Sequence, residues 1–265
     1  MISLLPRQSI SIFLTLITPI IAIIISVLLG LLIFSSLGFN PAQSLYYFFV
    51  FPVSRPDQIA ALFVKACPLI IIASGLVFCF RANVWNIGAE GQLILGAVFS
   101  GWVALSFLES ESVFLLPLMM LAGALGGIIW ALIPAILKVR FNTNEILVSL
   151  MLTYVASLFI DWLVRGPWRD PMSFGFPLTP SYSDAALIER IYIPFIGYVG
   201  QLHYGVLIAI FVSVVLWFLL MKMITGFQIR VTGEAPNASI FAGFNPSLVT
   251  VIVMAISGGT AGLAG

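Results

Sequence analysis

The chain has 265 residues, of which 61% are hydrophobic and 8% are charged, and its formal net charge is +1. Charged residues at this low fraction cannot cover the surface of a soluble domain of this size. The chain must therefore use lipid as its solvent. A balanced charge offers nucleic acid no basic surface, and one histidine with two cysteines speaks against a transition-metal cluster.

Seven apolar stretches, taken in chain order, are candidates for membrane-spanning helices, which need about 20 residues each. They are residues 11–36, 58–80, 91–108, 113–137, 146–165, 203–224 and 247–265, and the last ends without a polar flank or a helix stop signal. The sequence predicts an all-α polytopic membrane protein. We expect one transmembrane domain over residues 1–265, with the last span cut off.

Basic residues orient the chain, because Lys and Arg accumulate on the cytoplasmic side. A cytoplasmic N-terminus places six of them inside: Arg7, Arg81, Lys138, Arg140, Lys222 and Arg230. It leaves outside the acidic hairpin with Glu109 and Glu111 and the long segment 166–202, for which we expect short interfacial helices.

Between the second and third spans, "NVWNIGAEGQ" places polar side chains and glycines in an otherwise apolar region. Two interpretations remain open from spacing alone. Residues 83–92 form either a cytoplasmic turn that leaves Glu90 in water, or a broken helix inside the membrane that is buried in protein or lines a water-filled cavity. In the second case a helix begins near Gly91.

The inner connections carry helix-boundary signals. Asn142 followed by Glu145 resembles a capping box at the start of the next span. Pro236 and Gly243 bound a short helix over about 236–242, and Asn245-Pro246 caps the last span. A short helix of this kind lies on the membrane or docks into another protein.

Several other features favour structural roles. Cys67 and Cys79 lie about 18 Å apart on one helix, too far for a disulfide. Asp161 and Arg165 have the spacing of a local ion pair. Lys65 can extend to the membrane surface, and His203 lies at a predicted membrane boundary.

Paired glycines at 123 and 127, and at 258 and 262, permit close helix packing. The chain has no P-loop, so it does not hydrolyse nucleotide by that route.

Three segments resemble a known family: "FRANVWNIGAEGQLILGA", "FNTNEILVSLMLTYVA" and "GFQIRVTGEAPNASIFAGFNPSLVTVIVMAISGGTAGLAG". Together they resemble the permease subunits of bacterial ABC importers for nucleosides and simple sugars, in the superfamily of ribose-type and branched-chain amino-acid permeases. Trp85 replaces the family's Phe, and Val231-Thr232 replaces its usual Ala-Val. Family members continue beyond residue 265, so this chain is C-terminally incomplete relative to them.

The resemblance implies a multi-pass permease of the bacterial plasma membrane with no catalytic residue, cofactor or metal of its own. Its implied partners are cytoplasmic ABC ATPase subunits, a second, related permease subunit and an extracytoplasmic solute-binding protein or lipoprotein, within membrane lipid and without nucleic acid. Candidates for the solute path are Asn83, Asn86, Glu90, Gln92, Asn142 and Asn144. In the loop about 225–246, candidates for ATPase coupling are Arg230, Gly233, Glu234, Asn237, Phe241 and Gly243.

A secondary, ion-coupled transporter of a small polar solute is the main alternative. It would usually show an internal repeat and intramembrane carboxylates, yet no clear repeat is visible and Asp161 is the strongest such acid besides Glu90. A membrane enzyme would need a convergent catalytic group, which the sequence lacks. A non-transporting receptor or structural subunit is the third alternative.

Overall fold

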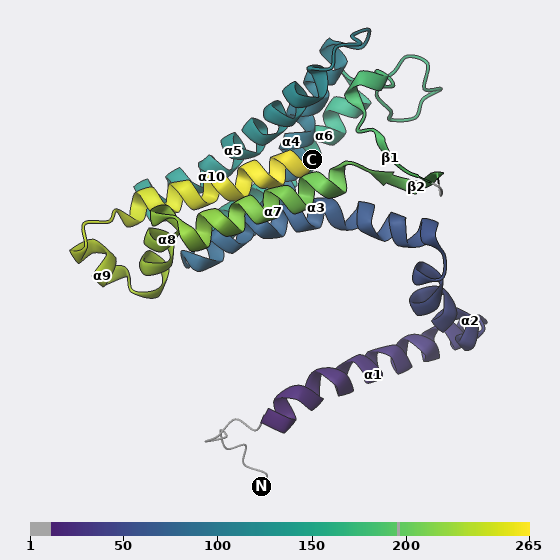
Figure 1. The fold of residues 1–265 in the computed structure, drawn as a ribbon, viewed down its shortest axis with the longest axis horizontal. Coiled ribbons are helices and arrows are strands. Elements are labelled where there is room, and N and C mark those ends of the chain that lie inside the picture. Colours follow the sequence, from purple (N-terminus) through teal and green to yellow (C-terminus); the bar gives the residue numbers. More distant parts are fainter. Residues whose placement is uncertain (1–11, 195–196) are drawn as a thin grey trace. The chain divides into compact units, whose positions relative to one another are not determined.

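The computed structural model describes residues 12–194 and 197–265 (Figure 1). By internal contacts the chain divides into two compact units, Met1–Leu62 and Phe63–Gly265. Within the described residues, seven helices are long and apolar enough to cross a membrane. Each lies within a few residues of a predicted span, which confirms the all-α polytopic class.

The first unit contains α1 (Ile12–Ser36), α2 (Pro41–Leu45), the π-helical turn η1 (Tyr46–Val50), the 3₁₀ turn η2 (Phe51–Val53) and the start of α3 (Pro56–Arg81). The Asn40 side chain caps α2 by accepting from the amides of Ala42 and Gln43. Arg7 lies outside the described residues.

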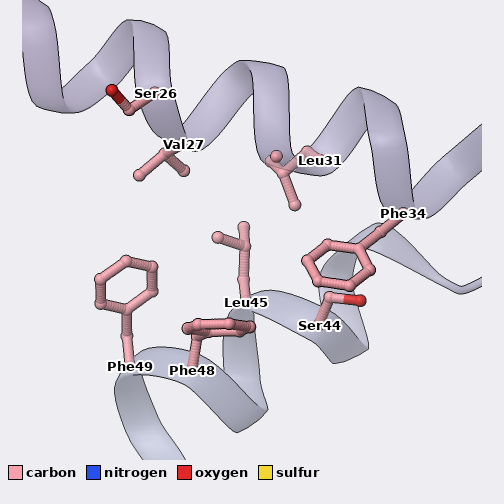
Figure 2. A pocket seen from close by; sticks show the side chains of 9 residues that line it. Ser26, Val27, Leu31, Phe34, Ser44, Leu45, Phe48 and Phe49 are labelled. Carbon is pink, nitrogen blue, oxygen red and sulfur yellow. The ribbon is translucent and has the colours of Figure 1, made fainter. Parts of the chain in front are cut away.

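An apolar groove of about 230 Å³ runs between α1 and η1 (Figure 2). Phe34 of α1 faces Phe48 of η1, with ring centroids 6.0 Å apart. Because this lining is almost entirely hydrocarbon, the groove suits lipid chains rather than a polar solute.

The second unit is a helical bundle made of the rest of α3 with α4 (Ala89–Ser106), α5 (Leu115–Phe141), α6 (Glu145–Arg165), α7 (Gly205–Lys222) and α10 (Pro246–Ala264). Two shorter helices, α8 (Ile224–Glu234) and α9 (Pro236–Phe241), connect α7 to α10 at one end of the bundle (Figure 1). The sequence predicts α9, whereas α8 was not expected from it.

Glycines bring α5 and α10 into backbone contact. A Cβ added at Gly127 would overlap the Gly258 carbonyl oxygen and lie 2.7 Å from the Gly262 Cα. One at Gly123 would lie 2.7 Å from the Gly262 carbonyl oxygen. The two predicted glycine pairs therefore pack against each other, and we call this contact the glycine seam.

The segment between α6 and α7 corrects one expectation. Instead of short interfacial helices, its described residues form a 3₁₀ turn, η3 (Asp184–Ala186), and an antiparallel hairpin of β1 (Arg190–Ile193) and β2 (Gly197–His203). Arg190 pairs with His203, and Tyr192 with Tyr198. Ile191, Tyr192, Tyr198 and Val199 are β-branched or aromatic, which favours strands over helix.

Three minor predictions are confirmed. Cys67 and Cys79 are free, buried thiols on α3. Arg165 donates to Asp161 at 2.7 Å across one turn of α6. His203 has a structural role, because its Nδ1 accepts from the Gly205 amide at the start of α7, at 3.1 Å.

The glycine seam predicts a stability effect. Gly127→Ala forces α5 away from α10 because the added methyl meets backbone that cannot rotate aside, and we expect a loss of about 1–3 kcal/mol. Thermal unfolding of the purified protein in detergent measures the loss. Gly30→Ala is the matched control, since a Cβ there meets no atom within 4 Å. Equal melting temperatures for the two variants would contradict the seam.

Candidate functional site

The polar segment after α3 is a break between two helices, within the protein interior. α3 ends at Arg81 and α4 begins at Ala89, two residues before the predicted start. Residues 84–88 have no regular structure, and burial alternates along 82–88, with the even-numbered residues buried and the odd-numbered ones exposed. The backbone between α3 and α4 is therefore non-helical, and the placement of this segment at membrane depth stays a prediction. We call residues 82–88 the break.

Asn83 closes the end of α3. Its φ of 56° lies in the left-handed region, where Asn is tolerated better than other non-glycine residues. The Val84 amide donates to the Cys79 carbonyl at 2.9 Å, and the Asn83 amide to the Phe80 carbonyl at 3.1 Å. This bonding pattern is a Schellman motif, so backbone conformation alone accounts for an asparagine here.

Asn86 and Gln92 bind each other rather than facing an open path. Asn86 Nδ2 donates to Gln92 Oε1 at 2.9 Å, and Gln92 Nε2 donates back to Asn86 Oδ1 at 3.0 Å. Asn86 also donates to Ser257 Oγ of α10 at 2.9 Å and accepts from the Gly88 amide at 3.1 Å. With 2% and 1% of their surface exposed, both amides hold the break together in the interior.

The Ser257 contact places the break along the length of α10. Ser257 is eleven residues into α10, about 16 Å from its first residue at 1.5 Å per residue. Further along, Gly96 of α4 touches Gly262 of α10. The first turn of α4 thus lies beside the middle of a helix that is long and apolar enough to span a membrane.

The start of α6 supports the break from the other side. Glu145 forms an ion pair with Lys138 at the end of α5 and accepts from the Trp85 amide at 3.5 Å. Ser149 Oγ accepts from the Ile87 amide at 3.3 Å. Gly88 and Gly91 let the chain approach α6 closely, since added Cβ atoms would lie 2.8 Å from the Ser149 Cβ and 2.9 Å from the Thr153 Cα.

Asn142 and Asn144 are helix caps, which their sequence context had allowed. Asn142 ends α5 with a left-handed φ of 51°. The Asn144 side chain caps α6 by accepting from the Ile146 amide at 2.9 Å. The expected capping box from Asn142 to Glu145 is wrong, because Asn142 closes the preceding helix and Asn144 opens the next.

Glu90 is the remaining candidate for the solute path, and it is exposed on the first turn of α4. Across the described parts of the chain, its carboxylate has no hydrogen bond or ion pair. Beside the break, the exposed rings of Phe80 and Trp85 contact each other, with centroids 5.5 Å apart.

Candidates for ATPase coupling divide into exposed and packed residues. Phe241 is 94% exposed on α9, and Glu234 and Asn237 are also exposed. Gly243 ends α9 with a φ of +81°, and Asn245 caps α10 through the Ser247 and Leu248 amides, as predicted. The other two pack inward.

Arg230 and Gly233 attach α8 to the bundle. Arg230 Nη1 donates to the Leu220 carbonyl at the end of α7, at 2.6 Å. A Cβ at Gly233 would overlap the Arg81 carbonyl oxygen and lie 2.9 Å from the Ala82 carbonyl carbon. These two residues thus attach α8 to the end of α7 and to the end of α3.

Charge separates along the second unit. Lys138 and Arg140 lie in the last turn of α5, and Lys222 lies in the last turn of α7, which leads into α8. At the opposite ends of these helices, a cleft of about 770 Å³ is lined by four acidic residues, Glu109, Glu111, Asp184 and Glu189. The structure thus has a basic end, which bears α8 and α9, and an acidic end.

Three residues important to the site were not singled out for it from sequence: Ser149, Ser257 and Ile229. Serine in an apolar helix is common, so neither serine could be distinguished without the position of the break. Ile229 lies on α8, which was itself missed. Glu145 was noted only as a capping residue, whereas it links α5, α6 and the break.

Comparison with known proteins gives consistent matches. Residues 58–265 match the family described as the permease component of branched-chain amino acid transport systems. The chain is 32% identical to the glucose ABC transporter permease protein TsgB13 of Haloferax volcanii, over 98% of this chain and 69% of that protein. It is 30% identical to the guanosine ABC transporter permease protein NupP of Bacillus subtilis, over 94% and 70% of the two chains.

A third relative is the probable riboflavin import permease protein RfuC of Treponema pallidum. It is 30% identical over 91% of this chain and 63% of that protein. No solved structure matches this chain.

Adjacent positions on α4 provide a matched test of the amide pair. Gln92→Leu leaves Asn86 with unmet hydrogen bonds in the interior, and we expect a loss of stability of about 1–3 kcal/mol. Glu90→Leu, on the exposed face, leaves the melting temperature in detergent unchanged. Thermal unfolding of the two variants checks this, and an equal effect of both substitutions would be evidence against a structural amide pair.

Proposed function

The chain belongs to the family of permease components of branched-chain amino acid transport systems, and from that premise we propose which solute it carries and which residues act. It is a membrane-spanning permease subunit of an ATP-driven ABC importer, a transport subunit rather than an enzyme. This membership favours the ABC importer over the ion-coupled alternative.

We propose that Glu90 faces the solute path. A carboxylate beside the middle of a spanning helix costs about 2.5–3.5 kcal/mol if it faces lipid. The other five candidates for the path have structural partners or caps, whereas Glu90 is exposed and unpaired in the described residues. An aqueous path, or a partner subunit that encloses one, would remove this cost.

The proposed solute is a nucleoside or a simple sugar. Relatives are named for glucose, guanosine and riboflavin, and all three compounds carry several hydroxyl groups. A carboxylate accepts hydrogen bonds from hydroxyl groups, and an exposed aromatic face such as that of Trp85 can stack against a base or a sugar ring.

We propose that the basic end of the second unit faces the cytoplasm. Lys and Arg mark the cytoplasmic side of a membrane, and Lys138, Arg140 and Lys222 lie in the last turns of α5 and α7. The N-terminus would then also be cytoplasmic, at a bacterial plasma membrane. The acidic cleft would face outward, toward a solute-binding protein or lipoprotein.

α9 is the proposed docking element for the ATPase. Phe241 and Ile240 expose apolar surface on a short helix at the basic end, where a soluble partner can reach them. ATP-driven closure of the ATPase pair would displace α9 and α8 and switch the path between outward and inward openings. A second, related permease subunit would complete the path.

Glu90→Leu tests the path. We expect uptake of radiolabelled guanosine or glucose into proteoliposomes of the whole transporter to fall about tenfold or more, because a hydrogen bond to a charged group contributes about 1.5–3 kcal/mol. Glu90→Gln retains a hydrogen-bond acceptor, so we expect its uptake to fall by less. Wild-type uptake by Glu90→Leu at equal reconstitution would remove Glu90 from the path.

Phe241→Asp tests the docking element. Placing a charge at a central apolar contact weakens ATPase binding by about 2 kcal/mol or more, so we expect the ATPase to be lost on co-purification. Phe107→Asp, at the exposed turn after α4, is the control and retains the ATPase. Retention of the ATPase by both variants would place its docking site elsewhere.

A further inference from the structure

The contact between α8 and the break is made by backbone on both sides. Gly233 presents no side chain, and the atoms that an added Cβ would meet first belong to the main chain of Arg81 and Ala82. Side-chain contacts can absorb a shift by changing rotamer, but backbone against backbone cannot. A displacement of α8 toward α3 must therefore move the end of α3 with it.

Apolar packing holds the same contact closed. Ile229 of α8, 3% exposed, belongs to one buried cluster with Ala82 and Val84 of the break and Val253 of α10. Pulling α8 away would expose this cluster, so motion in either direction is transmitted. Arg230 meanwhile keeps α8 attached to the end of α7.

Beyond the contact, the break is braced as far as Glu90. The Asn86–Gln92 pair joins the break to the first turn of α4, which carries Glu90.

A buried hydroxyl adjoins Gly233: Thr232 is 7% exposed, and its Oγ1 has no hydrogen-bond partner among residues 12–194 and 197–265. A buried hydroxyl without a partner destabilises this arrangement. A rearrangement of the contact between α8 and the break would let Thr232 gain a hydrogen bond.

We propose that Gly233 is a positioning residue that couples the ATPase docking element to the solute path through its backbone contact with Arg81. The inference rests on the proposed function, in which α9 binds the ATPase and Glu90 faces the path. Motion enters at α9, passes through α8 and Gly233 to the break, and reaches Glu90.

Gly233→Ala tests the coupling in the whole transporter, reconstituted with its ATPase and binding protein. We expect the ATPase to co-purify and hydrolyse ATP, while guanosine or glucose uptake per ATP falls about 2- to 30-fold, the range found for residues along coupling networks. Wild-type uptake per ATP would overturn the proposal. Gly30→Ala controls for the added methyl.

Ile229→Ala loosens the contact instead of crowding it, which keeps the test decisive if Gly233→Ala does not fold. The same uncoupling is expected. Ile224→Ala is the matched control on the same helix, because Ile224 is 77% exposed and lies outside the cluster. Equal uptake per ATP for Ile229→Ala and Ile224→Ala would overturn the proposal.

A labelling experiment separates coupling from general damage. Cysteines replace Asn237 on α9 and, in a second protein, Ile87 of the break, and maleimide labelling is compared with and without ATP and vanadate. In the wild-type background both rates change; with Gly233→Ala only the rate at α9 changes. A change at both sites in the variant contradicts transmission through Gly233. If the ATPase fails to protect α9 even in the wild-type background, it is the docking proposal that fails.

Discussion

The break depends on one constraint: backbone that leaves a helix inside an apolar protein must still have its hydrogen bonds. Lipid offers none, so such backbone persists only where protein groups replace it. Here, Asn86 accepts from the Gly88 amide, Ser149 from the Ile87 amide and Glu145 from the Trp85 amide. These side chains come from α6 and from the break itself, while Ser257 of α10 secures Asn86. The bundle and the break therefore require each other.

This constraint also changes how polar residues in such a chain should be interpreted. Amides in an oily sequence suggest solute binding, yet Asn86 and Gln92 satisfy each other, and Asn83, Asn142 and Asn144 serve the backbone at helix ends. What distinguishes Glu90 is the lack of any such role, not its polarity. An exposed acid whose carboxylate has no local partner in the described residues is a stronger candidate for function than a buried, fully bonded amide.

The sequence predicted those features whose causes are local. Helix lengths follow from apolar runs, and the ends of α9 and the start of α10 follow from Pro236, Gly243 and Asn245. The start of α6 was assigned to Asn142 instead of Asn144, because an asparagine can either close or open a helix and the two residues lie only two positions apart. The partners of the amides could not be predicted, since Ser257 lies 171 residues from Asn86. α8 was missed because two glycines and two threonines in eleven residues give it a weak helix propensity. Contacts of Arg230 and Gly233 hold it in place instead.

Stiffness then links structure to transport. The glycine seam between α5 and α10, the Gly96–Gly262 contact and the Gly233–Arg81 contact all place backbone against backbone, where little can deform. In the proposed coupling, a bundle joined in this way moves as a body, so a small displacement at α9 is not lost in side-chain rearrangement before it reaches the break. Looser packing around α8 would tolerate substitutions better, but it would absorb the displacement of α9 before the displacement reached the break. In the proposed coupling, the lack of a side chain at Gly233, which leaves no room for substitution, is also what lets it transmit a displacement.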